Sequence, residues 1–342
     1  MKKFLSSALL VFGGICVAVG LAEGLVRIFA PHSRDHVVPA GMFEIDSELG
    51  WKLHPGKEVR HRTRYFDVGY SINSMGSRDR PRIAANANAK RRVLFFGDSQ
   101  IFGWGVTPDQ AVSGLVEAHS SSTEVWNMGV PGYGLDQEIL SYEKDGGSLS
   151  ATDVIFFVSV HTLGRSRSGF LFMKPKPRFL IDSAGRLVRV AVREKSSALT
   201  DLVYRILSPL YLPYFVETEL KRLTRRDAMR GNRDETVPVD PATMRLGMAL
   251  LLKARAIAAE RNHKMFLLAA LPDTSRKELK DFCDRNGIAM VGTPWPVAPR
   301  QLVFGKYDGH WNPRAHQLVA DRLLLALTGS GNGTTTNAAM TK

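Results

Sequence analysis

The most informative segment of the chain reads Arg91-Arg92-Val93-Leu94-Phe95-Phe96-Gly97-Asp98-Ser99-Gln100-Ile101-Phe102-Gly103. The apolar run from Val93 to Phe96 is typical of a buried strand in a parallel sheet. Gly97 ends that strand and allows a tight turn, so Ser99 lies just past the strand's carboxyl end, where open α/β sheets bind ligands. Gly-Asp-Ser is also ordinary turn chemistry, so a serine nucleophile here is a hypothesis that needs a base and an acid elsewhere.

Strands and helices alternate from residue 91 onward, which predicts βαβ units and a mostly parallel sheet. We therefore expect an α/β fold over 91–328, a three-layer open sheet with helices on both faces. The expected strands are 93–96, 124–128, 153–160, 264–271 and 288–291, and the expected helices are 107–116, 135–144, 241–261, 275–286 and 313–327.

The first thirty residues form a separate segment. Lys2-Lys3 precedes the uncharged apolar run 4–22, which is just long enough to span a bilayer. The lysines predict a cytoplasmic N-terminus and a translocated remainder. A cleaved signal peptide is the main alternative, because Gly20-Leu21-Ala22 resembles a cleavage site. We favour an uncleaved anchor over 1–30, since the apolar pattern resumes after Glu23.

Three further segments depart from the α/β pattern. Residues 31–90 form an irregular basic preface, broken by prolines and glycines, with short strands. Residues 161–240 form an insertion with a hairpin around Asp182-Ser183-Ala184-Gly185. Within it, the run from Leu207 to Phe215 could lie on a membrane, but we expect it to pack in the core. The tail 329–342 is rich in Gly, Ser, Thr and Asn and is expected to be disordered.

The 342 residues have a globular composition, 44% hydrophobic and 23% charged, with a net charge of +13. Much of that charge lies in the preface and would face anionic lipid headgroups or acidic glycans, although a merely solvated basic surface is the simpler interpretation. No nucleic-acid module is visible, so no nucleic-acid partner is expected. The two cysteines, Cys16 and Cys283, cannot staple the domain, and Cys283 is expected to be buried.

Two other segments supply possible partners for Ser99. Tyr307-Asp308-Gly309-His310-Trp311-Asn312 contains a histidine with a nearby acid, and Asn127-Met128-Gly129-Val130-Pro131-Gly132-Tyr133-Gly134 forms a glycine-rich turn after the second strand. In this order, the segments resemble the first, second and last sequence blocks of the SGNH, or GDSL, hydrolase family. The resemblance covers 91–327 without the insertion, and it implies an SGNH-hydrolase-like, flavodoxin-like sheet.

The resemblance also implies a catalytic triad. Ser99 would be the nucleophile, His310 the base, and Asp308 the acid that orients the imidazole. A plain turn before the last helix is the alternative interpretation of Asp308-Gly309-His310. Most of the family has its acid three residues before the histidine, where this chain has Tyr307. The Asp-x-His-Trp arrangement is instead similar to that of membrane-anchored enzymes that acetylate bacterial polysaccharides.

An oxyanion hole is the second implication of the resemblance. The backbone N–H groups of Ser99 and Gly129 would meet the negative oxygen of a tetrahedral intermediate. The family usually adds an asparagine after the third strand. Here His161 or Thr162 falls near that place, so an imidazole N–H or a hydroxyl would have to donate instead. His161 could equally be a structural histidine.

Three hypotheses on function follow. The first is a serine esterase that hydrolyses O-acetyl or other short acyl esters, on a glycan, through an acyl-serine intermediate. The second is an O-acetyltransferase of an exported polysaccharide with the same triad. The third is a non-catalytic glycan-binding or assembly subunit.

The expected partners are an acylated glycan or small ester substrate, the membrane, and proteins of polysaccharide biosynthesis. Neither a cofactor nor a metal is expected. The expected location is the bacterial inner membrane, with a single span and the catalytic domain on the periplasmic side.

Overall fold

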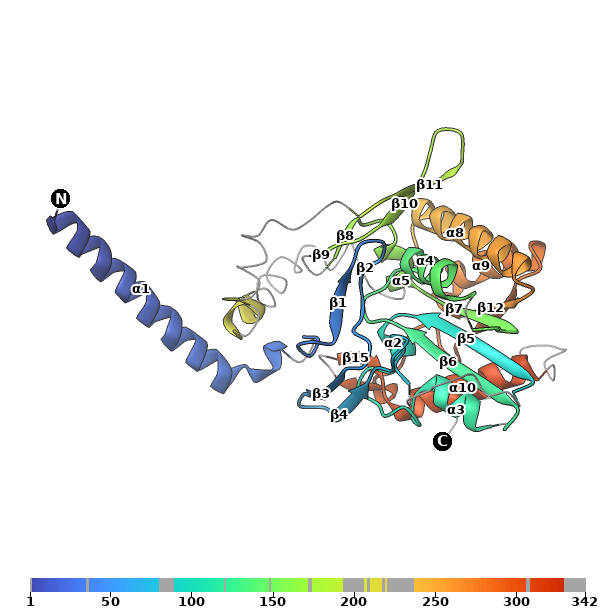
Figure 1. The fold of residues 1–342 in the computed structure, drawn as a ribbon, viewed down its shortest axis with the longest axis horizontal. Coiled ribbons are helices and arrows are strands. Elements are labelled where there is room, and N and C mark those ends of the chain that lie inside the picture. Colours follow the sequence, from blue (N-terminus) through green and yellow to red (C-terminus); the bar gives the residue numbers. More distant parts are fainter. Residues whose placement is uncertain are drawn as a thin grey trace.

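The structure is a computed structural model, and it consists of one long helix followed by a layered α/β body (Figure 1). The tail 329–342 and much of the insertion lie outside the described residues. The described residues are 2–34, 37–79, 89–119, 121–147, 149–171, 174–192, 206–207, 210–216, 219, 237–305 and 308–328.

Five parallel strands form the central sheet in the spatial order β13-β12-β7-β5-β6. The strand order reverses between β5 and β7, and such a switch point is where open α/β sheets bind ligands. The expected fold class is therefore confirmed. In chain order the strands are β5 (Arg91–Gly97), β6 (Thr123–Gly129), β7 (Asp153–Ser159), β12 (Lys264–Ala270) and β13 (Ala289–Gly292).

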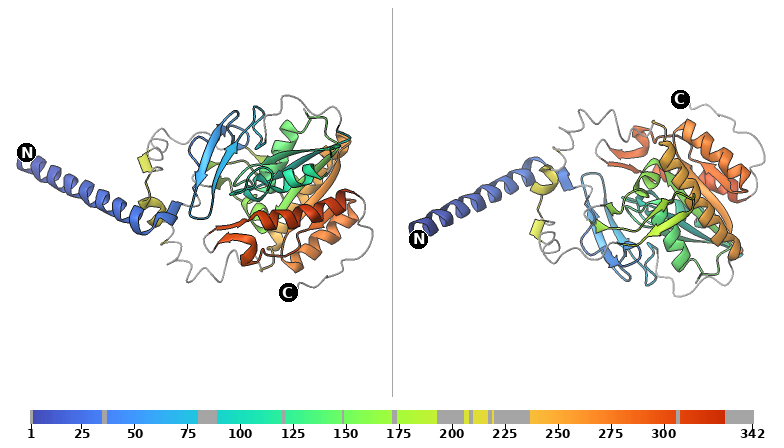
Figure 2. Two further views of the ribbon diagram at one scale, coloured as in Figure 1. Left: turned by 90° about the horizontal axis from the view of Figure 1, so that it is seen from below. Right: turned by 90° about the horizontal axis from the view of Figure 1, so that it is seen from above.

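Helices cover both faces of the sheet (Figure 2). Alternate residues of β5 divide between the two cores, with Leu94 and Phe96 on one side and Val93 and Phe95 on the other. Burial on both faces explains why this strand is a continuous apolar run. One layer contains α4 (Leu135–Asp145), α8 (Pro241–Glu260) and α9 (Asp273–Arg285), and the other contains α3 (Val112–Ala118) and α10 (Pro313–Leu327).

The described part of the preface contains two small hairpins, in agreement with the short strands expected there. One pairs β1 (Phe43–Asp46) with β2 (Gly50–Leu53), and the other pairs β3 (Glu58–Arg62) with β4 (Asp67–Ser71). Tyr70 of β4 packs edge-on against Phe102, with ring centroids 4.9 Å apart. The preface thus lies against the carboxyl end of β5.

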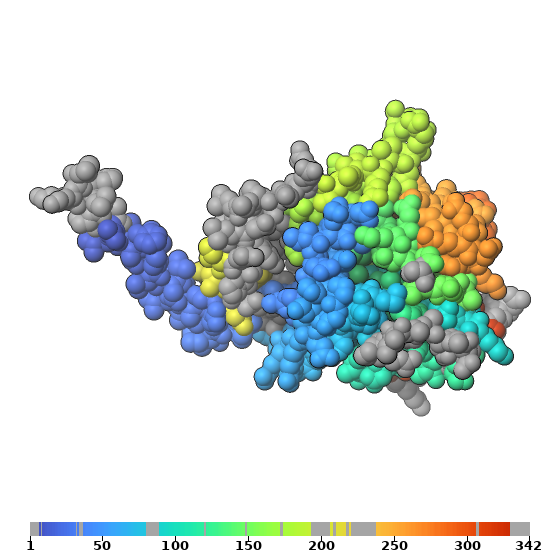
Figure 3. Space-filling model, viewed as in Figure 1, coloured from blue at the N-terminus to red at the C-terminus, as the bar shows by residue number. Residues whose placement is uncertain are grey.

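The insertion begins with α5 (Val160–Arg165) and continues as two antiparallel pairs. These are β8 (Phe170–Leu171) with β9 (Lys174–Pro175), and β10 (Arg178–Ile181) with β11 (Leu187–Val190). The hairpin expected around 182–185 is confirmed, and it protrudes from the body (Figure 3). The fully buried Lys176 fastens the insertion to α4, because its Nζ lies 2.5 Å from Asp136 Oδ2.

Two expectations within these segments are wrong. The helix expected from Thr107 starts at Val112, because Thr107 to Gln110 form a turn in which Gln110 N–H donates to the Thr107 carbonyl. The run 207–215 does not pack in the core, since Leu207 is 42% exposed and no described residue of the run is buried. The backbone of this run is instead bonded to the N-terminal helix, because Tyr211 N–H and Leu212 N–H donate to the Glu23 carboxylate. Cys283, by contrast, is buried as expected.

The N-terminal helix α1 (Lys2–Phe29) projects from the body and is followed by the short 3-10 turn η1 (Pro31–Arg34) (Figure 1). Its Leu9–Phe29 portion has a mean hydropathy of 2.2 and is only 6% buried. By length and composition this helix could cross a membrane or serve as a signal sequence.

Candidate active site

Ser99 stands at the first position of the short helix α2 (Ser99–Phe102), directly after β5. Gly97 is required for this tight junction, because an added Cβ would lie 2.2 Å from Ile101 Cγ1 and 3.0 Å from Phe157 Cβ. Asp98 caps the helix, since its Oδ1 accepts a hydrogen bond of 2.9 Å from Gln100 N–H. The serine side chain is thereby fixed at the carboxyl edge of the sheet.

His310 is brought to Ser99 by a strand that the sequence did not predict. β15 (Asp308–Trp311) pairs with β14 (Val303–Gly305), which follows the 3-10 turn η2 (Arg300–Leu302). Across 211 positions of sequence, His310 Nε2 lies 2.8 Å from Ser99 Oγ. His310 Nδ1 lies 2.7 Å from Asp308 Oδ1 on the other side of the ring. The three side chains therefore have the connectivity of a nucleophile, a base and an orienting acid.

Asp308 is held in its charged form by these contacts. Burial acts to raise the pKa of its carboxyl, but hydrogen bonds from the His310 ring and backbone N–H outweigh burial, and the pKa lies below its usual value. An ionised Asp308 requires a proton on His310 Nδ1, which leaves Nε2 free to accept the Ser99 hydroxyl proton. This geometry suits general-base activation of the serine.

The imidazole of His310 is supported by an aromatic wall, which consists of Trp104, His61 and Tyr70. Trp104 stacks on His310, with centroids 5.1 Å apart, and meets the His61 ring edge-on at 4.5 Å. The Tyr70 hydroxyl accepts a hydrogen bond from Gly105 N–H and lies 3.1 Å from His61 Nδ1. The wall links His310 to the β3–β4 hairpin, so the preface contributes to the site.

Arg78 holds the far end of α2. The residue is 2% exposed, and its guanidinium donates to the carbonyls of Phe102, Gly103 and Val106. Burial lowers the pKa of Arg78 to about 10, so the side chain remains charged at neutral pH. A positive charge at this C-terminus also complements the helix dipole. Arg78 is thus a positioning residue for the segment that carries Ser99.

The backbone N–H groups expected to form an oxyanion hole are not equally available in the structure. Gly129 N–H donates to Asn127 Oδ1 at 3.0 Å, so it is already engaged. Val130 to Tyr133 form a turn closed by Tyr133 N–H to the Val130 carbonyl, with Gly132 at φ +85°. This is type II geometry, which leaves the N–H of its third residue free. Within the described residues, neither Gly132 N–H nor Ser99 N–H has a hydrogen-bond partner.

The third-strand segment places Thr162 in a structural role. The Thr162 hydroxyl bonds with the N–H and carbonyl of Ser159, as part of the α5 cap. His161 lies half-buried in the first turn of α5, and its part in an oxyanion hole stays a prediction. Arg165, at the end of α5, donates to Asp98 Oδ2 at 2.8 Å and to the Tyr133 carbonyl at 3.1 Å. It therefore joins the Ser99 turn to the Gly132 turn.

Several residues that line or support the Ser99 region were not identified from the sequence. The Pro131-Gly132 pair is a local signal for a type II turn and could have identified Gly132. Arg78, Trp104 and Arg165 carry no such signal, because their partners are distant in sequence. Tyr307 lies outside the described residues. Among the described residues, no group of three or more His, Cys, Asp or Glu side chains could hold a metal ion.

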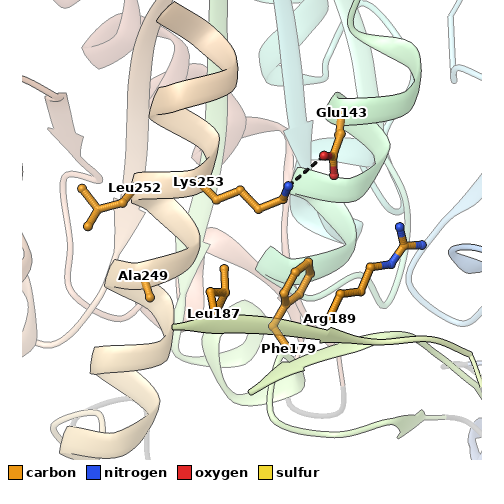
Figure 4. Close-up of a pocket in the computed structure, with 7 residues that line it drawn as sticks. All are labelled: Glu143, Phe179, Leu187, Arg189, Ala249, Leu252 and Lys253. Carbon is orange, nitrogen blue, oxygen red and sulfur yellow. Dashed lines mark hydrogen bonds and ion pairs between the residues drawn. The ribbon is translucent and has the colours of Figure 1, made fainter. Parts of the chain in front are cut away.

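A pocket of about 550 Å³ opens elsewhere, between α4, α8 and the β10–β11 hairpin (Figure 4). Lys253 and Glu143 form an ion pair of 2.8 Å across it. Glu143 lies near the end of α4, which runs back from the carboxyl edge, so the pocket is remote from Ser99. Its lining residues are Glu143, Phe179, Leu187, Arg189, Ala249, Leu252 and Lys253.

The fold and the site together define an α/β protein with a serine–histidine–aspartate constellation at its switch point. No family model and no curated protein matches the chain.

Solved structures with a similar fold include a member of the lipolytic protein G-D-S-L family from Veillonella parvula, with 13% identity over 70% of this chain and 98% of that one and a TM-score of 0.39. A GDSL-like lipase from Bacteroides thetaiotaomicron has 12% identity, coverage of 72% and 93%, and a TM-score of 0.39. A psychrotrophic esterase from Pseudoalteromonas sp. has 9% identity, coverage of 71% and 100%, and a TM-score of 0.42. At these identities and TM-scores, the chemistry must be argued from the side chains of this chain alone.

Proposed function

We propose that the protein is a serine esterase that hydrolyses short acyl esters through an acyl-serine intermediate. The observation that carries the proposal is the Ser99–His310–Asp308 hydrogen-bonded chain, with distances of 2.8 and 2.7 Å. A hydroxyl is a weak nucleophile until a neighbouring base takes its proton, and His310 is the only ring nitrogen within hydrogen-bonding distance of Ser99 Oγ among the described residues.

The steps follow from this arrangement. His310 Nε2 takes the Ser99 proton as Oγ attacks the ester carbonyl, and the tetrahedral intermediate places a negative charge on the former carbonyl oxygen. Collapse expels the alcohol, to which His310 gives the proton. Water then attacks the acyl carbon as the same nitrogen takes its proton, and collapse releases the acid while His310 returns the proton to Ser99 Oγ. Asp308 stabilises the imidazolium in both halves.

The negative oxygen would be bound by the N–H groups of Ser99 and Gly132. Both lack a partner among the described residues, and Arg165 ties their two turns together through Asp98 and Tyr133. Preorganised donors of this kind are each worth a rate factor on the order of 100 to 1,000. Gly129 would have to break its bond to Asn127 to serve in the same way.

The proposed substrate is an acyl ester on a glycan, and the proposed location is the outer side of the bacterial inner membrane. The Asp-x-His-Trp resemblance and the basic preface support the glycan. Trp311 does not, because it is 3% exposed and packs against Trp295 and His316. The apolar α1 helix supports the membrane location.

A fluorophosphonate probe tests the nucleophile without knowledge of the substrate. The detergent-solubilised full chain should be labelled, and Ser99→Ala should abolish labelling. Ser141→Ala is the matched control, because Ser141 is similarly buried but its hydroxyl faces Asp145 instead of a histidine. Absence of labelling in the folded wild-type chain would exclude the esterase and favour a glycan-binding subunit.

The same acyl-serine could pass its acyl group to a sugar hydroxyl. Protein that reacts with the probe is incubated with p-nitrophenyl acetate, with and without an oligosaccharide. This experiment distinguishes transfer of the acetyl group to water from transfer to the sugar. Release of acetate in both samples supports hydrolysis. Ser99-dependent O-acetyl sugar, formed at the expense of acetate, would identify a transferase.

A further inference from the structure

A short segment of the insertion is fastened to the N-terminal helix. Glu23 of α1 accepts hydrogen bonds from Tyr211 N–H at 2.9 Å and Leu212 N–H at 2.8 Å. Arg27, one turn further along α1, pairs with Glu23 at 2.6 Å and lies over the Tyr211 ring at 5.0 Å. The helical stretch 212–216 is therefore joined to α1, from which it is separated by most of the chain (Figure 1).

The fastened segment exposes apolar side chains. Ile206 is 57% exposed, Leu207 42% and Val216 44%. Residues 206–207 and 210–216, which we call the docking segment, contain no buried residue, although six of the nine are Ile, Leu, Val or Phe. Figure 2 shows the segment in yellow beside the end of α1 in both views. The adjoining α1 residues Leu25 and Phe29 are 56% and 77% exposed.

The attachment point lies inside the candidate membrane span. Leu9–Phe29 includes Glu23 and Arg27, so a bilayer crossed by α1 would have its boundary close to these two charged residues. Tyrosine suits that boundary, because its polar hydroxyl can face the headgroups while its ring faces the acyl chains. The apolar residues beside proline suit it as well, because their aliphatic side chains can face the acyl chains. The docking segment would then lie at the boundary between headgroups and acyl chains, where burial of its apolar side chains is favourable.

We propose that the docking segment rests on the lipid bilayer as a second membrane contact beside α1. The exposed apolar surface of the docking segment contacts lipid, and the bond to Glu23 fixes the depth of the segment in the bilayer. This contact turns the carboxyl edge of the sheet toward the membrane, because α2 and β15 lie on the side of the body nearest α1 (Figure 1). The proposal depends on the retained helix and is independent of the esterase chemistry.

Site-specific fluorescence in the full chain tests this contact. An environment-sensitive NBD dye is attached to Val216→Cys, or separately to Ile206→Cys, in a Cys16→Ala background; Cys283 is buried and remains. The protein is placed in nanodiscs of phosphatidylcholine and phosphatidylglycerol, with or without nitroxide-labelled lipid. Val188→Cys is the matched control, because Val188 is 43% exposed, close to the 44% of Val216, but lies on the β10–β11 hairpin.

Nitroxide lipid should quench the dye at 216 and at 206 several-fold more than at 188, with blue-shifted emission at the first two positions only. Equal quenching at 216, 206 and 188 would overturn the proposal. Blue-shifted emission at 216 in native membranes, without quenching in nanodiscs, would also overturn it and would identify a protein partner instead of lipid. An intact mass for the labelled chain confirms that α1 is retained.

Discussion

The indole ring of Trp104 stacks on the imidazole ring of His310, with an angle of 26° between the ring planes. Behind it, His61 and Tyr70 of the preface complete the support. The proposed base is therefore held by a wall that ends in the β3–β4 hairpin, outside the α/β body. This relationship makes the preface part of the site and leads to the first prediction.

Trp104→Ala should lower kcat for p-nitrophenyl acetate more than it changes KM, because the imidazole loses the surface that orients it. A misplacement on the order of 1 Å commonly costs about 100-fold. Trp104→Phe should restore most of the rate, since it returns a ring to the same place. Trp126→Ala is the control, because Trp126 is equally buried but lies in β6 and should affect stability alone. An unchanged kcat in folded Trp104→Ala would contradict the positioning role.

Arg78→Lys should impair both stability and activity. One ammonium cannot reproduce the fork that reaches Phe102, Gly103 and Val106, and buried carbonyls left without donors cost about 1–3 kcal/mol. Fluorophosphonate labelling should slow at temperatures where the protein remains folded. Arg92→Lys is the matched control: Arg92 also binds carbonyls, those of Leu149 and Ser150, at the opposite edge of the sheet. Equal labelling rates in both variants would limit Arg78 to a structural role.

Local features of the fold were predicted well because they depend on neighbouring residues. Asp240 and Asn312 each cap a helix that starts with proline, and the predicted starts of α8 and α10 are confirmed. The apolar run of β5 also needs no distant information. The pair Thr107-Pro108 also resembles a cap followed by proline, but the helix expected from Thr107 does not start there, because Thr107 to Gln110 form a turn.

The site itself depends on contacts that a single sequence does not encode locally. The approach of His310 to Ser99 was anticipated only through the family resemblance, and β15, which delivers it, reads as a turn. Arg78 resembles any other basic residue of the preface until its three carbonyl partners are known. The hydrogen bond from Gly129 N–H to Asn127 Oδ1 likewise depends on the backbone conformation after β6, which the sequence alone does not give.

Asp308→Asn should remove most of the turnover while leaving the fold intact. An amide beside His310 Nδ1 favours the tautomer with its proton on Nε2, which can no longer accept the Ser99 proton, and the analogous change in serine proteases costs about 10,000-fold in kcat. Circular dichroism checks the fold and p-nitrophenyl acetate hydrolysis checks the rate. Asp46→Asn is the control, since Asp46 is also buried and accepts two backbone N–H bonds, but away from Ser99. Near-normal kcat in Asp308→Asn would remove this residue from the triad.

Acid should destabilise the protein partly through His61. Burial lowers the pKa of His61 from 6.5 to about 4, so between these values the unfolded chain binds a proton that the folded His61 does not. The stability that this residue contributes is therefore complete above pH 6.5 and is lost as the pH falls toward 4. Linkage gives a loss of about 2 kcal/mol between pH 7 and 4.5.

Guanidinium unfolding of the detergent-solubilised full chain at these two pH values measures the loss. His61→Gln should reduce the difference in unfolding free energy by that amount, because glutamine keeps an acceptor for the Tyr70 hydroxyl but does not titrate. His316→Asn offers an independent check, since burial lowers the pKa of His316 to about 3 and its removal should also flatten the profile. If neither variant narrows the gap between pH 7 and 4.5, buried neutral histidines are not what makes the fold sensitive to acid.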